Sequence, residues 1–428
     1  MPGKNETRVA VFLGGRSPEH DVSVITGLQA LKAIDQERFV AFPVYVGPRG
    51  EWLVGDALSK RRNYLPDART RGELTEVSLS LGEPGHGVLA PKRSGLFQRR
   101  TALKFDVALL AFHGLGGEDG QMQGLFETAN LPYTGMRTLA SSVFMDKVAT
   151  KRLLRGLDIP LLPYAVVPRG AGGLPSPDEL QRLLAGVGLP CIVKPVHLGS
   201  SIGVGKAESV EEVRALLPVI FRLDNQALLE PFVPNLVEYN LSVTRAGGGV
   251  RTSAIECPKR AEELLDFRQK YLSGNDGKSG IKSDGGESQG MLSQGMLSQG
   301  MLSQGMLSQG MLSQGMLSLT REINPALPAG LEENLRRWAS SAFEAVDGSG
   351  APRVDFYCNA ATGETWLNEV NPCPGSFGYF LWEAADPPIR FTALLSRMID
   401  EAMARHRERQ LPDDPVPAEA RLLRRPSA

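Results

Sequence analysis

Residues 193–205 read Val-Lys-Pro-Val-His-Leu-Gly-Ser-Ser-Ile-Gly-Val-Gly, an apolar run followed by a loop with three glycines and two serines. We expect a strand over 191–196 to enter this loop and a strand over 201–206 to leave it. Backbone N–H groups in such a loop can point at phosphate oxygens, and Lys194 adds a positive charge beside them. The segment indicates a phosphate site, although a purely structural turn would have the same composition.

The Gly-rich loop is not a Walker A loop. Before Gly205-Lys206, the glycine that the Walker A motif requires five residues upstream is replaced by Ser200, and Ala207 stands where a Ser or Thr would hold magnesium.

Carboxylates gather in a second segment, where Arg353-Val-Asp355 precedes Asn368-Glu-Val-Asn371. In adjacent strands, Asp355, Glu369 and Asn371 could converge, because Glu369 and Asn371 are two residues apart and face the same side. Arg353, two residues before Asp355, would share its face. Carboxylate and amide oxygens are hard ligands suited to magnesium that bridges nucleotide phosphates. Arg353 could stabilise negative charge that develops in a transition state. The alternative is a set of unconnected surface carboxylates at strand ends.

The rest of the chain alternates strand and helix patterns around these two segments. The apolar run from Arg8 to Leu13 predicts a strand buried on both faces of a parallel sheet. It starts a βαβ unit, and residues 63–100 predict loops or an extra hairpin. Further expected strands are 39–46, 106–112, 227–232, 238–244, 250–256, 353–358 and 365–371, and expected helices are 22–34, 138–154, 210–217, 330–346 and 392–407.

Composition limits the classes of function. The 428 residues carry 47 Lys+Arg against 48 Asp+Glu, and this balance offers no basic surface for nucleic acid or an anionic membrane. Four cysteines without a Cys-x-x-Cys pair do not form a disulfide framework. We see no signal peptide, and no apolar run approaches the roughly 18 residues of a transmembrane helix. We therefore expect a cytoplasmic enzyme that binds neither nucleic acid nor membrane.

Residues 288–317 repeat Ser-Gln-Gly-Met-Leu six times and contain six of the 12 methionines. Five residues advance a helix by about 500°, and an odd period swaps faces in a strand. Neither structure can bury all the Met-Leu pairs on one side. We interpret the block as a disordered low-complexity insert, and the alternative is a lid extension or an interaction segment.

Taken together, the motifs resemble those of one family, the D-alanine–D-alanine ligases of the ATP-grasp superfamily. The resemblance runs from about Arg8 to Ala404 and depends on the order and spacing of the motifs. These are Gly14-Gly-Arg-Ser-Pro-Glu-His-Asp-Val-Ser23, His113-Gly-x-x-Gly-Glu-Asp-Gly120, Pro132-Tyr-Thr-Gly135, Met145-Asp-Lys147, Val193-Lys-Pro195, Gly199-Ser-Ser201, Lys270-Tyr271, Arg353-Val-Asp355 and Asn368-Glu-Val-Asn371.

The resemblance implies an α/β fold with a three-domain ATP-grasp architecture. An N-terminal parallel α/β sheet domain (1–138) would be followed by a central domain (139–229) and a C-terminal domain (230–410), both α+β, that sandwich ATP. The low-complexity insert would lie in a lid of the C-terminal domain, and residues 411–428 would form a flexible tail.

The resemblance also implies the reaction. ATP would phosphorylate a substrate carboxylate, and the amine of a second amino acid would attack the acyl phosphate. The product would be D-alanyl-D-alanine for peptidoglycan, the cofactors ATP and two Mg²⁺ or Mn²⁺ ions, and the assembly a homodimer.

Individual roles follow from the same resemblance. Glu19 would hold the ammonium of the first substrate, with Ser200 and Tyr271 locking a loop over the site. Arg353 and the Gly375 amide would stabilise the tetrahedral oxyanion. ATP would be held by Lys147, Lys194, Ser201, Glu230, Glu238 and Lys270, with Glu230 and Glu238 at the adenine and ribose, and the metal ions by Asp355, Glu369 and Asn371.

Some of these residues have a plainer alternative. Glu19 could simply place negative charge at the first turn of the helix that begins near Val22. Tyr271 could be a surface aromatic of its loop, and we interpret Cys373, in the site loop, as a bystander. We expect His113 beside the site but not as a general base.

The sequence departs from the family pattern in two places. The loop that carries Lys270-Tyr271 continues into the repeat before the chain resumes near Ile323. After Pro374-Gly375 the family has Thr-x-x-Ser, whose hydroxyl helps to hold the second substrate, whereas here Ser376-Phe-Gly-Tyr-Phe380 runs directly into Leu-Trp-Glu. Two alternatives to a D-alanine–D-alanine ligase therefore stay open. One is a ligase that joins another amino acid pair, and the other is a nucleotide-binding regulatory protein that has lost turnover.

Overall fold

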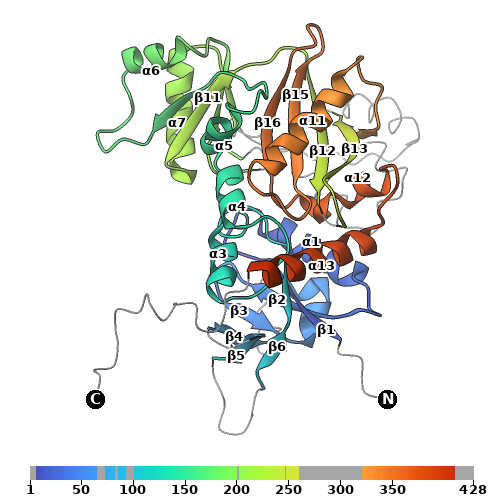
Figure 1. Cartoon of the computed structure of the whole chain (residues 1–428). Coiled ribbons are helices and arrows are strands. Elements are labelled where there is room, and N and C mark those ends of the chain that lie inside the picture. The colour runs from blue at the N-terminus through green and yellow to red at the C-terminus, as the bar shows by residue number, and fades with distance from the viewer. Residues whose placement is uncertain are drawn as a thin grey trace, which may run out of the picture.

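The computed structural model describes residues 6–64, 73–81, 85–92, 101–199, 202–245, 247–259 and 321–409. Within these ranges the chain forms three sheets, and Figure 1 shows the second and third side by side above the first. The expected site residues Ser200, Ser201, Lys270 and Tyr271, the repeat and the C-terminal tail lie outside the described residues.

The first sheet has seven strands and contains the predicted βαβ unit. β1 is parallel to its neighbours β2 and β7, with α1 (His20–Ala33) in the first crossover. The remaining pairs are antiparallel, so the expectation of a parallel sheet was wrong for β3 to β6. Five residues join β2 to β3 and six join β4 to β5, and connections this short allow hairpins but no crossover helix. The order is β6 (Leu103–Phe105), β5 (Gly87–Pro91), β4 (Thr75–Ser80), β3 (Trp52–Val54), β2 (Phe39–Val46), β1 (Thr7–Gly14) and β7 (Val107–Leu110).

The second sheet has four antiparallel strands with two helices packed on one face. Leu180 and Leu184 of α6 and Val213 and Leu217 of α7 bury themselves against the strands. A capping box between Ser176 and Glu179 starts α6. The strands are β10 (Gly205–Ala207), β9 (Cys191–Pro195), β11 (Gln226–Pro231) and β8 (Ala165–Pro168), in that order, and the helices are α6 (Pro177–Leu184) and α7 (Val210–Leu223).

The third sheet has five antiparallel strands and carries the predicted acidic segment. Val354 and Phe356 of β15 face a core formed with α11 (Leu331–Glu344), so Arg353 and Asp355 lie on the opposite face. The strand order is β14 (Arg321–Ile323), β13 (Arg251–Pro258), β12 (Leu236–Thr244), β15 (Arg353–Asn359) and β16 (Thr365–Asn371). Short elements elsewhere are η1 (Asp56–Ser59), η2 (Arg61–Tyr64), α3 (Gln121–Thr128), η3 (Gly375–Gly378) and α12 (Tyr379–Glu383).

The helix predicted over 138–154 is two helices, α4 (Thr138–Met145) and α5 (Lys147–Leu154). Asp146 separates them with an extended backbone, and its carboxylate accepts hydrogen bonds from the N–H groups of Val148 and Ala149 at 2.8 Å. A side chain that caps the second helix this well competes with continuation of the first. The break places Lys147 at the first turn of α5.

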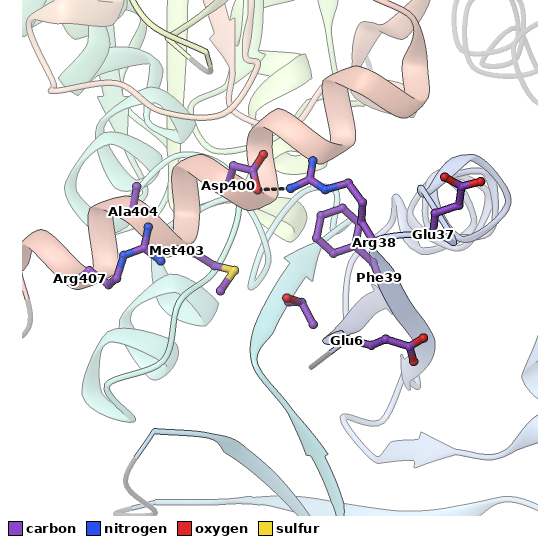
Figure 2. A pocket seen from close by; sticks show the side chains of 9 residues that line it. Glu6, Glu37, Arg38, Phe39, Asp400, Met403, Ala404 and Arg407 are labelled. Carbon is purple, nitrogen blue, oxygen red and sulfur yellow. Dashed lines mark hydrogen bonds and ion pairs between the residues drawn. The ribbon is translucent and has the colours of Figure 1, made fainter. Parts of the chain in front are cut away.

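The C-terminal helix α13 (Phe391–Arg409) packs on the first sheet although it ends the described chain. Leu394, Met398 and Ile399 share a core with Val9 of β1. Figure 2 shows α13 beside the start of β2, where Arg38 and Asp400 form an ion pair of 2.7 Å and line an open hollow. In the part of the chain that the structure describes, no helix is long and apolar enough to cross a membrane.

Candidate active site

Four polar side chains form a row across the third sheet. Glu256 on β13 lies opposite Asn240 on β12, Asn240 opposite Asp355 on β15, and Asp355 opposite Glu369 on β16. Directly opposed residues of antiparallel strands share a face. Glu256, Asn240 and Asp355 are buried, so the row concentrates acidic groups where water is largely excluded.

Arg353 and Asn371 bind the central carboxylate of this row. Arg353 donates from Nε to Oδ1 of Asp355 at 2.6 Å and from a terminal nitrogen to Oδ2 at 2.7 Å, and Asn371 donates to Oδ2 at 2.9 Å. Burial raises the pKa of Asp355 to about 6 and outweighs the charge of Arg353, while Glu369 and Glu256 raise it further. The predicted convergence of Asp355, Glu369 and Asn371 is therefore present, with Arg353 on the same face as Asp355.

Lys147 reaches the same acidic row from α5. Its Nζ lies 3.5 Å from Oε2 of Glu369 and donates to the carbonyl of Leu198 at 2.6 Å. It thereby lies between the acidic row and the segment that leads into the Gly-rich loop. A cation at this point suits a phosphate chain that extends along the loop.

Lys194 and Glu230 meet in a buried ion cluster that the sequence did not predict. Lys194 on β9 lies 2.5 Å from Oε2 of Glu230 on β11, and Lys151 of α5 lies 2.6 Å from Oε1. Lys194 also donates to Oδ1 of Asn368 at 3.1 Å. Desolvation raises the pKa of Glu230, but the positive charges of Lys194 and Lys151 lower it by more, so that the pKa lies below its ordinary value. Glu230 is therefore ionised.

A cavity of about 160 Å³ lies between the second and third sheets over these residues. Its polar end carries Lys147, Lys194, Glu230 and Glu369, and its other walls are apolar side chains such as Phe232. Complete small-molecule sites span roughly 300–1,000 Å³. The cavity is therefore large enough for one part of a nucleotide and too small for a complete one. The open hollow of Figure 2, about 580 Å³, lies away from the acidic row and the lysines.

Glu238 lies next to this cavity on β12, opposite Tyr357 of β15. Tyr357 lines the cavity, and desolvation together with the charges of Glu238 and Glu369 raises its pKa well above the ordinary value. The tyrosine hydroxyl therefore stays neutral.

Glu19 brings the first sheet to the site. It precedes α1, and a methyl group added at Gly114 would lie 2.6 Å from its Oε2, while one added at Gly199 would lie 3.3 Å away. Gly114 also has a φ of +75°, which side chains rarely adopt. Glu19 thus lies between the His113-Gly114 loop and the residue before Ser200, where a substrate ammonium could be held.

Glu118 connects two loops beside Glu19. Its carboxylate accepts from the N–H of Gly114 at 2.6 Å and from the N–H of Cys373 at 2.8 Å. Burial, with the nearby charge of Glu19, raises its pKa to about 8 despite these two donors. Glu118 therefore positions the segment that leads to Gly375.

His113 is a buried neutral neighbour of the site. Burial, then the charge of Arg353, lowers its pKa to about 4. Its Nε2 lies 2.9 Å from the hydroxyl of Thr26, which also accepts from the N–H of Ser376 at 3.1 Å. Burial therefore keeps the His113 ring neutral at neutral pH.

The loop after Gly375 is fastened to α1 and to the first sheet. Ser376 and Phe377 have left-handed backbones, with φ of 52° and 56°, and the Ser376 hydroxyl donates to Gln29 of α1. Phe377 is buried in the core that β1 and α13 share. A Cβ added at Gly375 would meet nothing within 4 Å, so this residue borders open space.

The expected metal ligands provide two carboxylates and one amide. Within the described ranges, no group of three or more His, Cys, Asp and Glu could hold a metal ion. Asp355 and Glu369 lie opposite each other, and Asn371 is bonded to Asp355. Such oxygen donors suit Mg²⁺ in a site that substrate phosphates and water complete, so the residues fit a nucleotide-bound metal.

The sequence analysis assigned no role to four residues of this site: Lys151, Glu118, Asn240 and Glu256. Glu118 stood in a quoted motif, which was the available signal. Asn240 and Glu256 can be recognised only from strand register, and Lys151 has the spacing of an ordinary surface lysine one turn after Lys147.

His197 links the Gly-rich segment to two carboxylates, which leads to a prediction about stability. Its ring lies 3.4 Å from Asp146 and 2.9 Å from Asp224, and these partners raise its pKa to about 9. Because the unfolded value is near 6.5, the protonated ring contributes its full stability below about pH 6.5 and loses it as pH rises through 9. We expect His197→Gln to lower the free energy of unfolding by about 1–2 kcal/mol at pH 6.

Urea unfolding of wild type and His197→Gln at pH 6 and at pH 10 tests this. The difference should shrink at pH 10. An equal difference at both values would show that the charged ring is not responsible.

Family models match most of the chain. The D-ala D-ala ligase N-terminus matches residues 8–136, and the D-ala D-ala ligase C-terminus matches residues 153–290 and 318–400. The second match is interrupted at the repeat.

Curated relatives agree along nearly the whole length. The chain is 30% identical over 411 residues to D-alanine–D-alanine ligase A of Bradyrhizobium diazoefficiens, covering 95% of this chain and 97% of the relative. It is 31% identical to D-alanine–D-alanine ligase of Heliobacterium modesticaldum, with coverage of 94% and 96%.

Solved structures show the same fold. The D-alanine–D-alanine ligase of Coxiella burnetii matches with a TM-score of 0.70 at 22% identity, covering 95% of this chain and 96% of that one. The VanG D-Ala:D-Ser ligase of Enterococcus faecalis matches with a TM-score of 0.67 at 21% identity, covering 93% and 100%. With the two family models and relatives at 30% identity or more, these matches show that the chain belongs to the D-alanine–D-alanine ligase family of ATP-grasp enzymes.

Proposed function

We propose that the protein joins two D-amino acids in an ATP-dependent reaction and that D-alanyl-D-alanine for peptidoglycan is its product. The observation that carries the proposal is the acidic row beside Lys147 and Arg353 at the mouth of a cavity sized for a nucleotide base. The membership of the family supports the choice of D-alanine as substrate. Because ATP is the proposed energy source, we propose that the reaction takes place in the cytoplasm.

The proposed mechanism assigns each group of residues one task. ATP, when bound, would supply the phosphoryl group that turns a carboxylate into an acyl phosphate, with ADP as the leaving group, and Mg²⁺ or Mn²⁺ would offset the charge of the phosphates; the phosphate leaves when the amide forms. Glu19 orients the first amino acid through its ammonium, and Lys147 and Lys194 bind phosphate oxygens. Arg353 and the Gly375 amide stabilise the oxyanion formed when the second amine attacks. Asp355, Glu369 and Asn371 would hold two metal ions.

Roles on residues outside the described ranges remain part of the proposal. Lys270 would contact the transferred phosphoryl group, Ser201 the nucleotide, and Ser200 and Tyr271 would close the loop over Glu19. Within the described ranges, Glu230 and Glu238 would hold the adenine and ribose. The homodimer also remains a prediction, which the mass in solution at working concentration would test.

A second candidate is a ligase that joins a different pair of amino acids. The observation that favours it is the loop 375–378, whose Ser376 hydroxyl donates to Gln29 of α1. A hydroxyl engaged in this way is not directed to a second substrate. A neighbour in fold, VanG, is a D-Ala:D-Ser ligase by name, which shows that this fold accommodates such pairs.

Phosphate release from ATP, measured with magnesium and D-alanine, D-serine, D-lactate or L-amino acids, decides between the candidates. We expect phosphate release when D-alanine is the only amino acid present. Release only with mixed pairs would support the second candidate, and none with any acceptor would support a regulatory protein without turnover. Mass spectrometry of the product identifies the pair that is joined.

Deletion of residues 288–317 should leave kcat and both KM values within about twofold of wild type. The five-residue period cannot present one apolar face in a helix or a strand, so we expect the repeat to make no packed contact on which the reaction depends. Steady-state kinetics on the deletion, which keeps Lys270 and Tyr271, tests this. A loss of turnover of tenfold or more would show that the repeat takes part in the reaction.

A further inference from the structure

Lys151 is the buried cation of the ion cluster for which the proposed mechanism has no use. Its side chain is 1% exposed, its Nζ lies 2.6 Å from Glu230, and it donates to the carbonyl of Leu162 at 3.3 Å. The cavity wall contains Lys194 and Glu230 but, among the described residues, not Lys151. Lys151 therefore contacts Glu230 from outside the cavity.

The cluster contains two lysines and one carboxylate. One oxygen of Glu230 lies 2.5 Å from Lys194 and the other 2.6 Å from Lys151. The three groups together carry one net positive charge. Without Lys151, Glu230 would neutralise Lys194, and the pair would present no net charge to an anion in the cavity.

Burying a lysine is costly, and this cost is visible at Lys151. Desolvation lowers its pKa although Glu230 pulls in the opposite direction. Replacing a whole buried ion cluster by well-packed apolar side chains is often neutral or stabilising, so packing alone does not require a charge at this position. A buried lysine that balances a carboxylate at the cavity wall has an electrostatic effect beyond packing, because low dielectric strengthens the field at that wall.

We propose that Lys151 is a positioning residue for nucleotide binding, which neutralises Glu230 and so leaves the charge of Lys194 available to the nucleotide phosphates. This inference rests on the proposed ATP-dependent function. The ligand it concerns is the phosphate part of the nucleotide, and Lys151 itself touches no part of the ligand.

Charge-changing variants of the cluster make the test. The phosphate contribution is the ratio of the adenosine and ADP dissociation constants, measured by titration calorimetry with magnesium and without amino acids. This ratio cancels any direct contact of residue 230 with the adenine. Net charge of the cluster is +1 in wild type, 0 in Lys151→Met, +1 in Lys151→Met/Glu230→Gln and +2 in Glu230→Gln.

The ratio should follow this charge. We expect it to fall about tenfold in Lys151→Met and to return to within about twofold of wild type in the double variant. Glu230→Gln alone should match or exceed wild type. Lys92→Met, which removes a lysine from the exposed Lys92–Glu76 pair of the first sheet, is the matched control and should leave the ratio unchanged.

The outcomes separate this inference from the proposed function. Equal ratios in all variants, or a tenfold loss in Lys151→Met that the double variant does not recover, would overturn the role of Lys151 while ADP binding by wild type stands. Absence of ADP binding by wild type would overturn the proposed function as well. If a thermal melt shows that Lys151→Met is not folded, the double variant and Glu230→Gln still test the predicted dependence of the ratio on cluster charge. A ratio in the double variant far below that of wild type would contradict this dependence.

Discussion

Replacing Arg353 with alanine is expected to lower kcat by at least about 10²–10³ while ADP still binds. Arg353 holds Asp355 through two hydrogen bonds, and its charge also lowers the pKa of His113. It is therefore the cation placed between the acidic row and the loops of the first sheet. Its loss removes the positive charge that would stabilise the oxyanion during amide formation.

Two measurements make this prediction specific. Phosphate release gives kcat, and calorimetry with ADP shows whether the nucleotide site persists. Because breaking a buried pair can cost about 3–5 kcal/mol, Arg353→Lys serves as the control: it keeps the charge, loses the two-pronged contact and should retain more turnover than the alanine variant. Wild-type kcat in Arg353→Ala would exclude this mechanism.

Replacing Phe377 with alanine is expected to lower the free energy of unfolding by about 3–5 kcal/mol. The ring is 2% exposed and packs in the core formed by β1, α1 and α13, with its centroid 6.4 Å from that of Phe391. Removing it leaves a cavity and releases the loop that follows Gly375. The KM for the second amino acid should therefore rise more than the KM for the first.

Chemical denaturation and separate KM measurements test both parts. Phe377→Leu keeps most of the volume and should lose less than about 1.5 kcal/mol. A loss below about 1 kcal/mol in Phe377→Ala would mean that the ring does not anchor the loop. A uniform rise of both KM values would mean that the loop has no special relation to the second substrate.

Local pattern was sufficient wherever one short segment decides the structure. The apolar run that became β1 and the two strands 353–358 and 365–371 are confirmed nearly to the residue. The hairpin expected within 63–100 is present as β4 and β5. These segments carry their own period or turn signals, and burial only reinforces them.

Pattern was insufficient where a side-chain conformation or a connection between strands decides the outcome. Nothing near Asp146 shows that it caps a second helix rather than continuing the first, because the choice depends on its side-chain conformation. The first sheet is mixed in part because the connections of β2 to β3 and of β4 to β5, five and six residues long, are too short for the crossover of a parallel pair.

The sequence by itself determined the family, the order of the motifs and the positions of Arg353, Asp355 and Asn371, because each depends on spacing within one or two neighbouring strands. Tertiary structure alone decided that Asn240 and Glu256 extend this row and that Lys151 joins Glu230 from another element. Strand register and buried charge balance are properties of segments far apart in the chain. They arise only when packing brings those segments together and removes water from between them.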